Sequence, residues 1–149
     1  MKTLSIEDLV FAPSSAPAAP SRGKVWTGRV LAGLPLLFLT WDAAMKLLAV
    51  PQVVEASSRL GFAPGTLPVL GVAELAAVVL TLVRRTRVLG AVLLTAYLGG
   101  AVETHVRLGD PLLSHTLFPI YFAALIWGGL SLLDARIREA SPFAPKRPR

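Results

Sequence analysis

The chain has 149 residues, of which 54% are hydrophobic and 16% charged, with a formal net charge of +6 and no cysteine. This composition is typical of a membrane protein, and the lack of cysteine excludes disulfides, thiol redox chemistry, iron–sulfur clusters and cysteine-based zinc sites. The basic residues lie in short clusters at the ends of apolar segments, without interleaved aromatic residues, so we assign them to membrane topology and predict no nucleic-acid partner.

Residues 1–24 are rich in Pro, Ala and Ser, and they lack the charged-then-apolar order of a signal peptide. We predict a flexible N-terminal tail here, with a short amphipathic segment at LSIEDLVF as the alternative. Four apolar segments follow at residues 25–49, 67–83, 88–108 and 112–133, each near the roughly 20 residues that cross a hydrocarbon core. The predicted fold is therefore all-α, a transmembrane four-helix bundle over residues 25–134, followed by a basic, disordered C-terminal tail at 135–149.

The segments that connect the four predicted spans contain patterns typical of helix starts, helix ends and turns. PQVVEASSRLGF combines Pro51 at a helix first turn, a Glu55/Arg59 pair one turn apart and Gly61 as a C-terminal cap, so we predict a short interfacial helix between the first two spans. RRTR predicts a tight basic turn between the second and third spans, and Gly109 with Pro111 breaks the helix before the fourth. Small residues four apart predict close helix contacts, or reflect only the abundance of Ala and Gly, at Ala73/Ala77, Ala96/Gly100 and Ala124/Gly128.

The Lys and Arg distribution predicts the orientation. With both termini on one side, that side receives twelve basic residues and the other receives Lys46, Arg59 and Arg107. Because cytoplasmic segments carry the excess of Lys and Arg, both termini are expected in the cytoplasm of a multi-pass protein of the bacterial plasma membrane.

Polar residues within the apolar segments all fall in the outer half of this topology, where they form one layer. A charged group inside a span is costly and normally faces the bundle interior or a cavity, which makes it a candidate for function. We predict a polar pocket open to the outer face. Its candidate ligand-binding residues are Asp42, Lys46, Glu74, Thr104, His105, Asp110 and His115.

Each candidate has a structural alternative. Asp42 and Lys46, four residues apart on one helix face, form either part of a site or a self-neutralised ion pair. Glu74 has no cation on its own helix, so it pairs across helices, with Lys46 the expected partner, or takes a proton. His105 and His115 are near the surface, where an interfacial role is as reasonable as a ligand role.

Other patterns exclude some chemistry. Glu103 lies about 200° around the helix from His105 and shares a stripe with Arg107, so we predict a peripheral ion pair that points away from the pocket. No spacing places two metal ligands on one helical face, and no phosphate-binding loop or nucleophile elbow is present, so no metal site and no catalytic residue is assigned.

Three runs resemble a known family: WDAAMKLLAVPQVVEASSRLGF, LPVLGVAELAAVVLTLVRRTRVLGAVLL and YLGGAVETHVRLGDPLLSH. They are similar to the DoxX-like proteins, small four-helix bacterial membrane proteins, over about residues 30–134. That family is named for the small subunit of an archaeal thiosulfate:quinone oxidoreductase, and other members resemble partners in membrane redox complexes. The resemblance carries over Lys46, Glu74, His105 and Asp110 as site residues without naming a reaction.

We therefore predict an auxiliary membrane subunit without activity of its own, which binds a quinone-like or other small lipophilic molecule and serves a redox protein partner. No motif specifies a cofactor, and quinone is the one considered. The alternatives are a stand-alone isomerase or reductase that uses Glu74 and His105 as acid and base, and a structural or assembly protein with a neutralised ion network. Homo-oligomerisation is left open.

Overall fold

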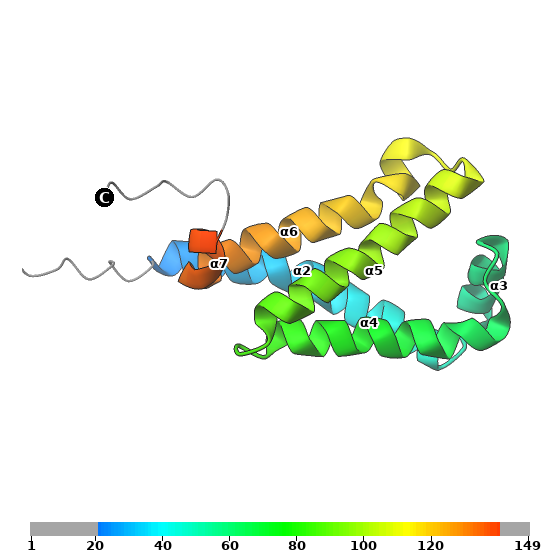
Figure 1. Ribbon diagram of the computed structural model, residues 1–149, viewed down its shortest axis with the longest axis horizontal. Coiled ribbons are helices and arrows are strands. Elements are labelled where there is room, and N and C mark those ends of the chain that lie inside the picture. Colours follow the sequence, from blue (N-terminus) through cyan, green and yellow to red (C-terminus); the bar gives the residue numbers. More distant parts are fainter. Residues whose placement is uncertain (1–20, 141–149) are drawn as a thin grey trace, which may run out of the picture.

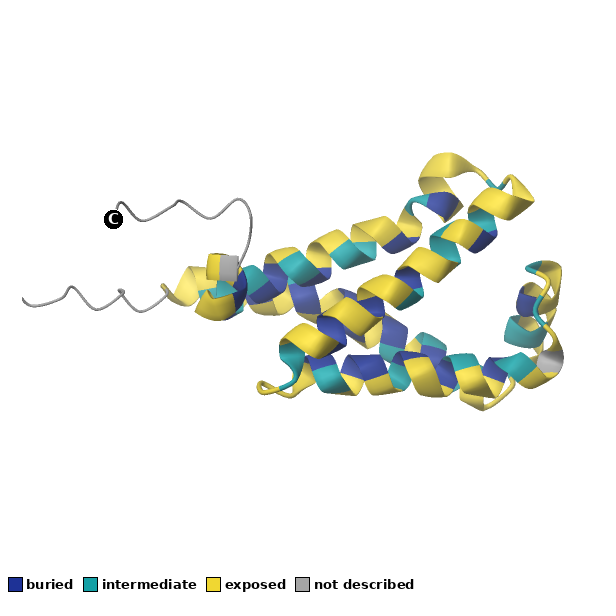
Figure 2. Cartoon of the chain, in the orientation of Figure 1, coloured by how far each residue is buried: buried dark blue, intermediate teal, exposed yellow. Residues whose placement is uncertain are grey.

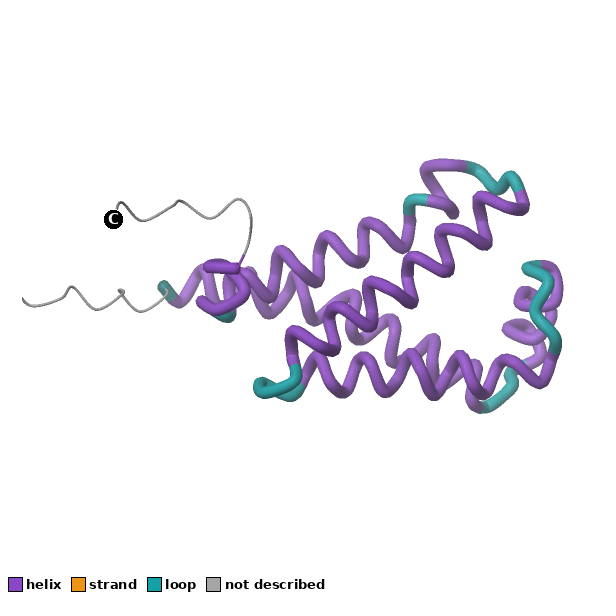
Figure 3. Tube along the Cα trace, in the orientation of Figure 1, coloured by secondary structure: helices purple, strands orange, loops and turns teal. Residues whose placement is uncertain are grey.

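The computed structural model describes residues 21–140, and it is helical throughout, with short loops and no strand in that range (Figure 3). The elements in chain order are α2 (Arg22–Leu47), α3 (Pro51–Arg59), the one-turn η1 (Pro64–Thr66), α4 (Leu67–Leu82), α5 (Arg87–Leu108), the π-helical turn η2 (Leu112–Thr116), α6 (Phe118–Leu133) and α7 (Ala135–Ala140). Three segments are long and apolar enough to cross a membrane: Arg22–Leu47, Arg87–Leu108 and Leu112–Leu133. At 16 residues, α4 is a shorter apolar helix.

The helix ends follow local chemistry. The hydroxyl of Ser21 accepts a hydrogen bond from the backbone N–H of Lys24, so α2 begins three residues before the predicted span. Pro51 starts α3, which confirms a helix between the first two predicted spans. Gly109 ends α5 with φ of 70°, a left-handed conformation that glycine adopts without steric penalty.

The fourth predicted span is interrupted. The chain forms η2 and then restarts as α6, whose first turn contains Pro119. Proline has no backbone N–H and is best tolerated in the first turn of a helix, so it favours a new helix start at this point over a continuous one. His115 therefore lies in a π-helical turn rather than in the first turn of a regular helix.

Helix packing brings distant parts of the chain together. α2 packs against both α4 and α6, and α5 packs against the same two helices. α5 diverges from α4 as it leaves their shared turn, and α3 stands at the open end of that angle (Figure 1). The buried apolar core is contributed by α2, α4, α5, α6 and α7, and it consists of Ala32, Leu36, Leu39, Ala77, Val78, Ala91, Leu94, Leu98, Ile126, Leu130 and Ile137.

Glycine permits the closest helix contacts. A Cβ atom on Gly129 of α6 would come within 2.7 Å of the Gly28 carbonyl oxygen of α2, and one on Gly90 of α5 would collide with the backbone of Thr81 at the end of α4. Gly100 and Gly128, in contrast, have nothing within 4 Å of such an atom. The prediction of close contacts at those two glycines is wrong, because Gly100 lines the cavity described below and Gly128 is exposed.

The outward faces of the helices are apolar. Large hydrophobic side chains are exposed along their length, among them Leu34, Leu37, Val72, Val79 and Val92. Exposed residues recur along each of the long helices in Figure 2. In water such a surface would be unfavourable, whereas in a bilayer it contacts lipid chains. The predicted contact with a lipid bilayer follows from these faces.

Asp134 joins three segments at the end opposite to α3. Its carboxylate accepts hydrogen bonds from the backbone N–H of Arg136 at 3.1 Å and from its guanidinium at 3.0 and 3.2 Å, and Arg87 Nη1 lies 3.6 Å away. Arg136 also donates to the Arg84 carbonyl, at 3.2 Å. These hydrogen bonds from Arg136 hold the pKa of the Asp134 carboxyl below its usual range.

The same contacts explain α7. Asp134 accepts the Arg136 N–H as a helix-capping residue does, and Ile137 is buried against the core. The predicted C-terminal tail therefore starts with a helix at residues 135–140. The rest of that tail and residues 1–20 of the N-terminal tail lie outside the described residues.

Candidate functional site

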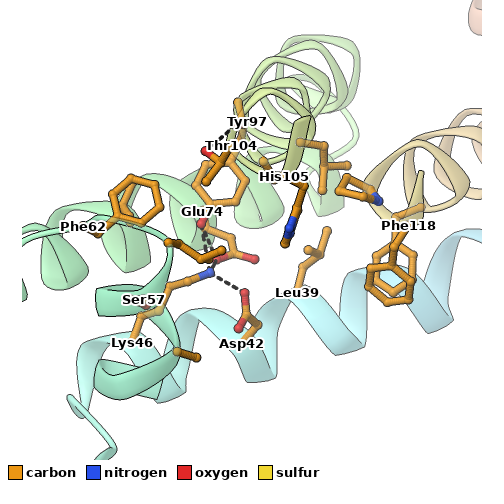
Figure 4. A pocket seen from close by; sticks show the side chains of 18 of the residues that line it. Leu39, Asp42, Lys46, Ser57, Phe62, Glu74, Tyr97, Thr104, His105 and Phe118 are labelled. Atoms are coloured by element: carbon orange, nitrogen blue, oxygen red, sulfur yellow. Dashed lines mark hydrogen bonds and ion pairs between the residues drawn. The ribbon is translucent and has the colours of Figure 1, made fainter. Parts of the chain in front are cut away.

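Lys46 is the centre of a polar cluster between α2, α4 and α5. Its ammonium donates to Asp42 Oδ2 on its own helix, to Glu74 Oε2 on α4 at 2.8 Å and to the Tyr97 hydroxyl on α5 at 2.9 Å (Figure 4). The Tyr97 hydroxyl in turn donates to Glu74 Oε2 at 3.0 Å. The predicted pairing of Lys46 with Asp42 and with Glu74 is confirmed.

A close contact between α2 and α4 makes this pairing possible. Gly71 lies one helical turn before Glu74, and a Cβ atom there would come within 3.0 Å of the Ala43 carbonyl oxygen and 3.1 Å of Lys46 Cβ. Because glycine lets the two backbones approach, the Lys46 ammonium reaches a carboxylate on the neighbouring helix. The side chain of Glu74 is fully buried, whereas those of Lys46 and Asp42 are 14% and 30% exposed.

The two oxygens of Glu74 have different surroundings. Oε2 accepts from both Lys46 and Tyr97. Oε1 is buried and has no hydrogen-bond partner among the described residues, and it is the only buried side-chain nitrogen or oxygen atom there of which this is true. An unpaired buried polar atom is unfavourable, which makes Oε1 a candidate contact for a ligand.

A cavity of about 680 Å³ lies beside this cluster. Its wall is mainly apolar, with Phe38, Phe118 and Phe122 packed on one another, and α3 contributes Ser57 and other residues to a further part of the wall. Figure 4 shows Asp42, Lys46, Glu74 and His105 turned toward the same space from α2, α4 and α5. A cavity of this size with a few polar groups in an apolar wall is typical of a site for a small organic molecule.

His105 separates this cavity from a smaller hollow under α3. Its Nδ1 lies 2.6 Å from Asp110 Oδ2, and its ring centroid is 5.9 Å from that of His115. The Ser114 hydroxyl lies 2.9 Å from His115 Nδ1. His105, Asp110 and His115 all line the hollow, together with Arg59.

The predicted polar layer thus divides into two groups. Asp42, Lys46, Glu74, Thr104 and His105 line the large cavity, while Asp110 and His115 line only the smaller hollow and contact His105 there. Thr104 is buried, and its hydroxyl donates to the Gly100 carbonyl at 2.9 Å. Within residues 21–140, no three His, Asp or Glu side chains are grouped so that they could hold a metal ion.

Two results differ from the sequence predictions. Glu103 lines the large cavity instead of pointing away from it, and Arg107 donates to the Leu60 carbonyl at 3.0 Å rather than pairing with Glu103. The loop after α3 approaches α5 closely enough to attract the guanidinium, which the helical spacing of the two residues did not indicate. Glu103 itself is exposed, at the edge of the cavity.

Tyr97 was missed by the sequence analysis. It lies seven residues before Thr104, so the two share one stripe of α5, about 20° apart. That spacing could have indicated that Tyr97 lies on the same face of α5 as the predicted site residue Thr104. A tyrosine in an apolar span is usually explained as packing, however, and only its contact with Lys46 and Glu74 makes it part of the cluster.

A comparison with protein-family models identifies the chain. The model of the DoxX-like family matches residues 30–129. The chain belongs to the DoxX-like family. No curated protein and no solved structure matches it. All residues that line the large cavity of this DoxX-like protein fall within the matched region, between Phe38 and Phe122. The family and the apolar helices together identify a multi-pass integral membrane protein.

Proposed function

We propose that this DoxX-like protein is an auxiliary membrane subunit that binds a small lipophilic molecule, quinone-like in size and polarity, in the cavity beside Glu74. The observation that carries the proposal is Glu74 Oε1, a buried carboxylate oxygen without a partner among the described residues, on a residue that lines a mainly apolar cavity of about 680 Å³. A charged group is costly inside a membrane protein, and ligand sites are a common reason for one. The other oxygen is fixed by Lys46 and Tyr97, so the free one has a defined position.

The proposed site comprises the cluster and its neighbours. Lys46, Asp42 and Tyr97 hold Glu74 in place, and Thr104 and His105 border the space that the ligand fills. Asp110 and His115 act on the ligand only indirectly, because they contact His105 from the neighbouring hollow. The proposed role as an auxiliary subunit of a redox protein rests on the family and not on the geometry of the site.

The proposed membrane arrangement is a four-helix bundle of α2, α4, α5 and the η2–α6 segment over residues 25–134, with α3 at the outer interface of a bacterial plasma membrane. Its support is that the exposed basic residues Arg22, Lys24, Arg84, Arg85 and Arg138 lie at helix ends away from α3. Both termini then face the cytoplasm.

Cysteine labelling tests this orientation. The chain has no cysteine, so single cysteines in place of Ser58 and Arg85, both exposed, report on the two ends. An impermeant thiol reagent added to intact cells should label the Ser58 variant and not the Arg85 variant. The reverse pattern would place the cavity on the cytoplasmic side and contradict the arrangement.

Co-purification tests the binding function. The protein is purified in mild detergent, and bound small molecules are identified by absorbance and mass spectrometry. Glu74→Gln, which keeps the shape of the side chain and removes its charge, should lose the bound molecule while retaining its helical content. Glu55→Gln is the matched control, because its carboxylate is exposed and is not among the residues that line the cavity, and it should retain the molecule.

The same experiment separates the alternatives. Glu74 and His105 line one cavity, which is the observation that favours a stand-alone isomerase or reductase using them as acid and base. Turnover of the identified molecule by the purified protein, lost in both Glu74→Gln and His105→Gln, would support that enzyme. Parent protein that carries no small molecule, with Glu74→Gln reducing stability, would instead support a structural role.

A further inference from the structure

Every hydrogen-bond donor of the Lys46 cluster is used within the cluster. A lysine ammonium has three N–H donors, and those of Lys46 have three acceptors within reach: Asp42 Oδ2, Glu74 Oε2 and the Tyr97 hydroxyl. The single O–H of Tyr97 points to Glu74 Oε2. The cluster therefore has no donor left for a ligand.

Acceptors, in contrast, remain. Glu74 Oε1 is unpaired, and Asp42 Oδ1 takes no hydrogen bond from a described residue. One of the two donors to Glu74 Oε2 is the Lys46 ammonium, whose positive charge favours the ionised form of the carboxylate. The Asp, Glu, Lys and Arg side chains that line the cavity are three carboxylates, those of Asp42, Glu74 and Glu103, and one cation, that of Lys46. Such a site attracts a group that donates hydrogen bonds.

His105 adds to this pattern. Its Nδ1 lies 2.6 Å from an Asp110 carboxylate oxygen, which can only accept, so Nδ1 carries the proton. In the neutral ring Nε2 is then an acceptor. Thr104 already donates its hydroxyl proton to Gly100. The remaining side-chain donors in the cavity wall are Gln52 and Ser57 of α3, and neither donates a hydrogen bond to Glu74, whose donors are Lys46 and Tyr97.

We infer that the cavity selects the hydrogen-bond-donating form of its ligand, a lipophilic molecule with a hydroxyl group such as a hydroquinone, over the matching carbonyl form. This inference rests on the proposed function and specifies its ligand class. A ring hydroxyl donates to Glu74 Oε1 and gives that oxygen the partner it lacks. A quinone carbonyl brings a further acceptor beside a carboxylate, and the two repel. The apolar body of either form packs on Phe38, Phe118 and Phe122.

The test compares three matched probes. A decyl-substituted hydroquinone, the corresponding benzoquinone and the dimethyl ether of the hydroquinone share ring and tail, and only the first donates a hydrogen bond. Their affinities for the purified full chain are measured by calorimetry in one detergent, with dithionite present for the hydroquinone and the ether. The reductant does not alter the protein, because the chain has no cysteine. The hydroquinone should bind at least about tenfold more tightly than the quinone or the ether, as expected of a buried hydrogen bond to a charged acceptor.

Two variants assign the preference to this cluster. Glu74→Gln presents an amide that both donates and accepts, so the preference should fall to nearly equal binding. Tyr97→Phe frees one N–H of Lys46 and should also reduce the preference, which keeps the test valid if Glu74→Gln fails to fold. Tyr121→Phe, an exposed tyrosine outside the cavity wall, should leave the preference unchanged.

The outcomes distinguish the two proposals. Equal binding of all three probes to the parent protein overturns the donor preference but leaves the binding function standing. A preference that persists in both variants shows that another group makes the distinction, and it also overturns the inference. No binding of any probe overturns the proposed quinone-like ligand, and the inference with it.

Discussion

The carboxylate clusters around Glu74 and around Asp134 use the same kinds of group at opposite ends of the molecule. Each joins helices through a buried carboxylate and basic side chains. At Asp134, two oxygens receive three hydrogen bonds from Arg136, and Arg87 lies near. At Glu74, one oxygen receives two hydrogen bonds while the other has no partner among the described residues.

This difference distinguishes the Asp134 cluster, which stabilises the fold, from the Glu74 cluster, which is a candidate ligand site. The Asp134 cluster has two cations for one carboxylate and lines neither of the two cavities described above, and its hydrogen bonds hold the helix ends together. The Glu74 cluster has carboxylates in excess, and Glu74 lines a large cavity. Buried charge by itself therefore does not indicate a site. The unpaired atom and the adjacent space do.

The largest expected effect is that of Lys46→Met. It leaves Asp42 and Glu74 without their shared cation, and removal of one partner of a buried ion pair costs about 3–5 kcal/mol. Thermal unfolding followed by circular dichroism in one detergent should show a clear loss of stability, smaller for Lys46→Arg. Arg59→Met is the control, since both partners of the exposed Arg59–Glu55 pair are mostly in solvent and such a pair contributes at most about 1 kcal/mol. A Lys46→Met variant as stable as Arg59→Met would contradict the buried cluster.

Asp134→Asn should have the next largest effect on stability. It should lower stability and retain the bound molecule, whereas Glu74→Gln should lose the bound molecule and retain its helical content. The amide cannot replace the charged acceptor for Arg136 and Arg87, so stability should fall by about 1–3 kcal/mol. The bound small molecule should be retained, because Asp134 is remote from both cavities. Melting temperature and mass spectrometry of the same preparation check both parts. Loss of the molecule in Asp134→Asn would show that the two clusters are not independent.

Tyr97→Phe should be milder. It removes one acceptor from Lys46 and one donor to Glu74, while the direct Lys46–Glu74 contact of 2.8 Å remains, so the expected loss is about 1 kcal/mol. Tyr121→Phe, whose hydroxyl makes no hydrogen bond within the described part of the chain, should melt like the parent protein. Equal melting of the two variants would mean that Tyr97 does not support the cluster.

The smallest effect concerns pH. The folded-state pKa of Asp134 is depressed, so its contribution to stability is present above the unfolded-state value of about 3.9 and is lost as the pH falls through the lower folded-state value. The melting-temperature difference between parent and Asp134→Asn should be constant above about pH 5 and shrink below about pH 4. A difference that stays constant down to the lowest pH would show that the carboxylate is not stabilised by Arg136.

The helical segments and most of the Lys46 cluster could be predicted from the sequence. Long apolar runs predicted the helical segments, since backbone groups in lipid must pair within their own segment. Charges inside those runs identified Asp42, Lys46 and Glu74, and the lack of a cation on the helix of Glu74 led to Lys46 as its partner. These predictions depended on composition and on the period of one helix, both of which are local.

Tertiary packing decided the rest. Three features of the site depend on how the helices rotate and cross. They are the position of Glu103 at the cavity, the choice of which Glu74 oxygen is left without a partner, and the distance of Asp110 from the ligand space. The crossings are set by backbone contacts at Gly28, Gly71, Gly90 and Gly129, which a count of small residues four apart did not identify. Helical period fixes angles around one axis only, whereas a cavity forms between several axes, so its volume and its unpaired oxygen arise only once the helices have packed.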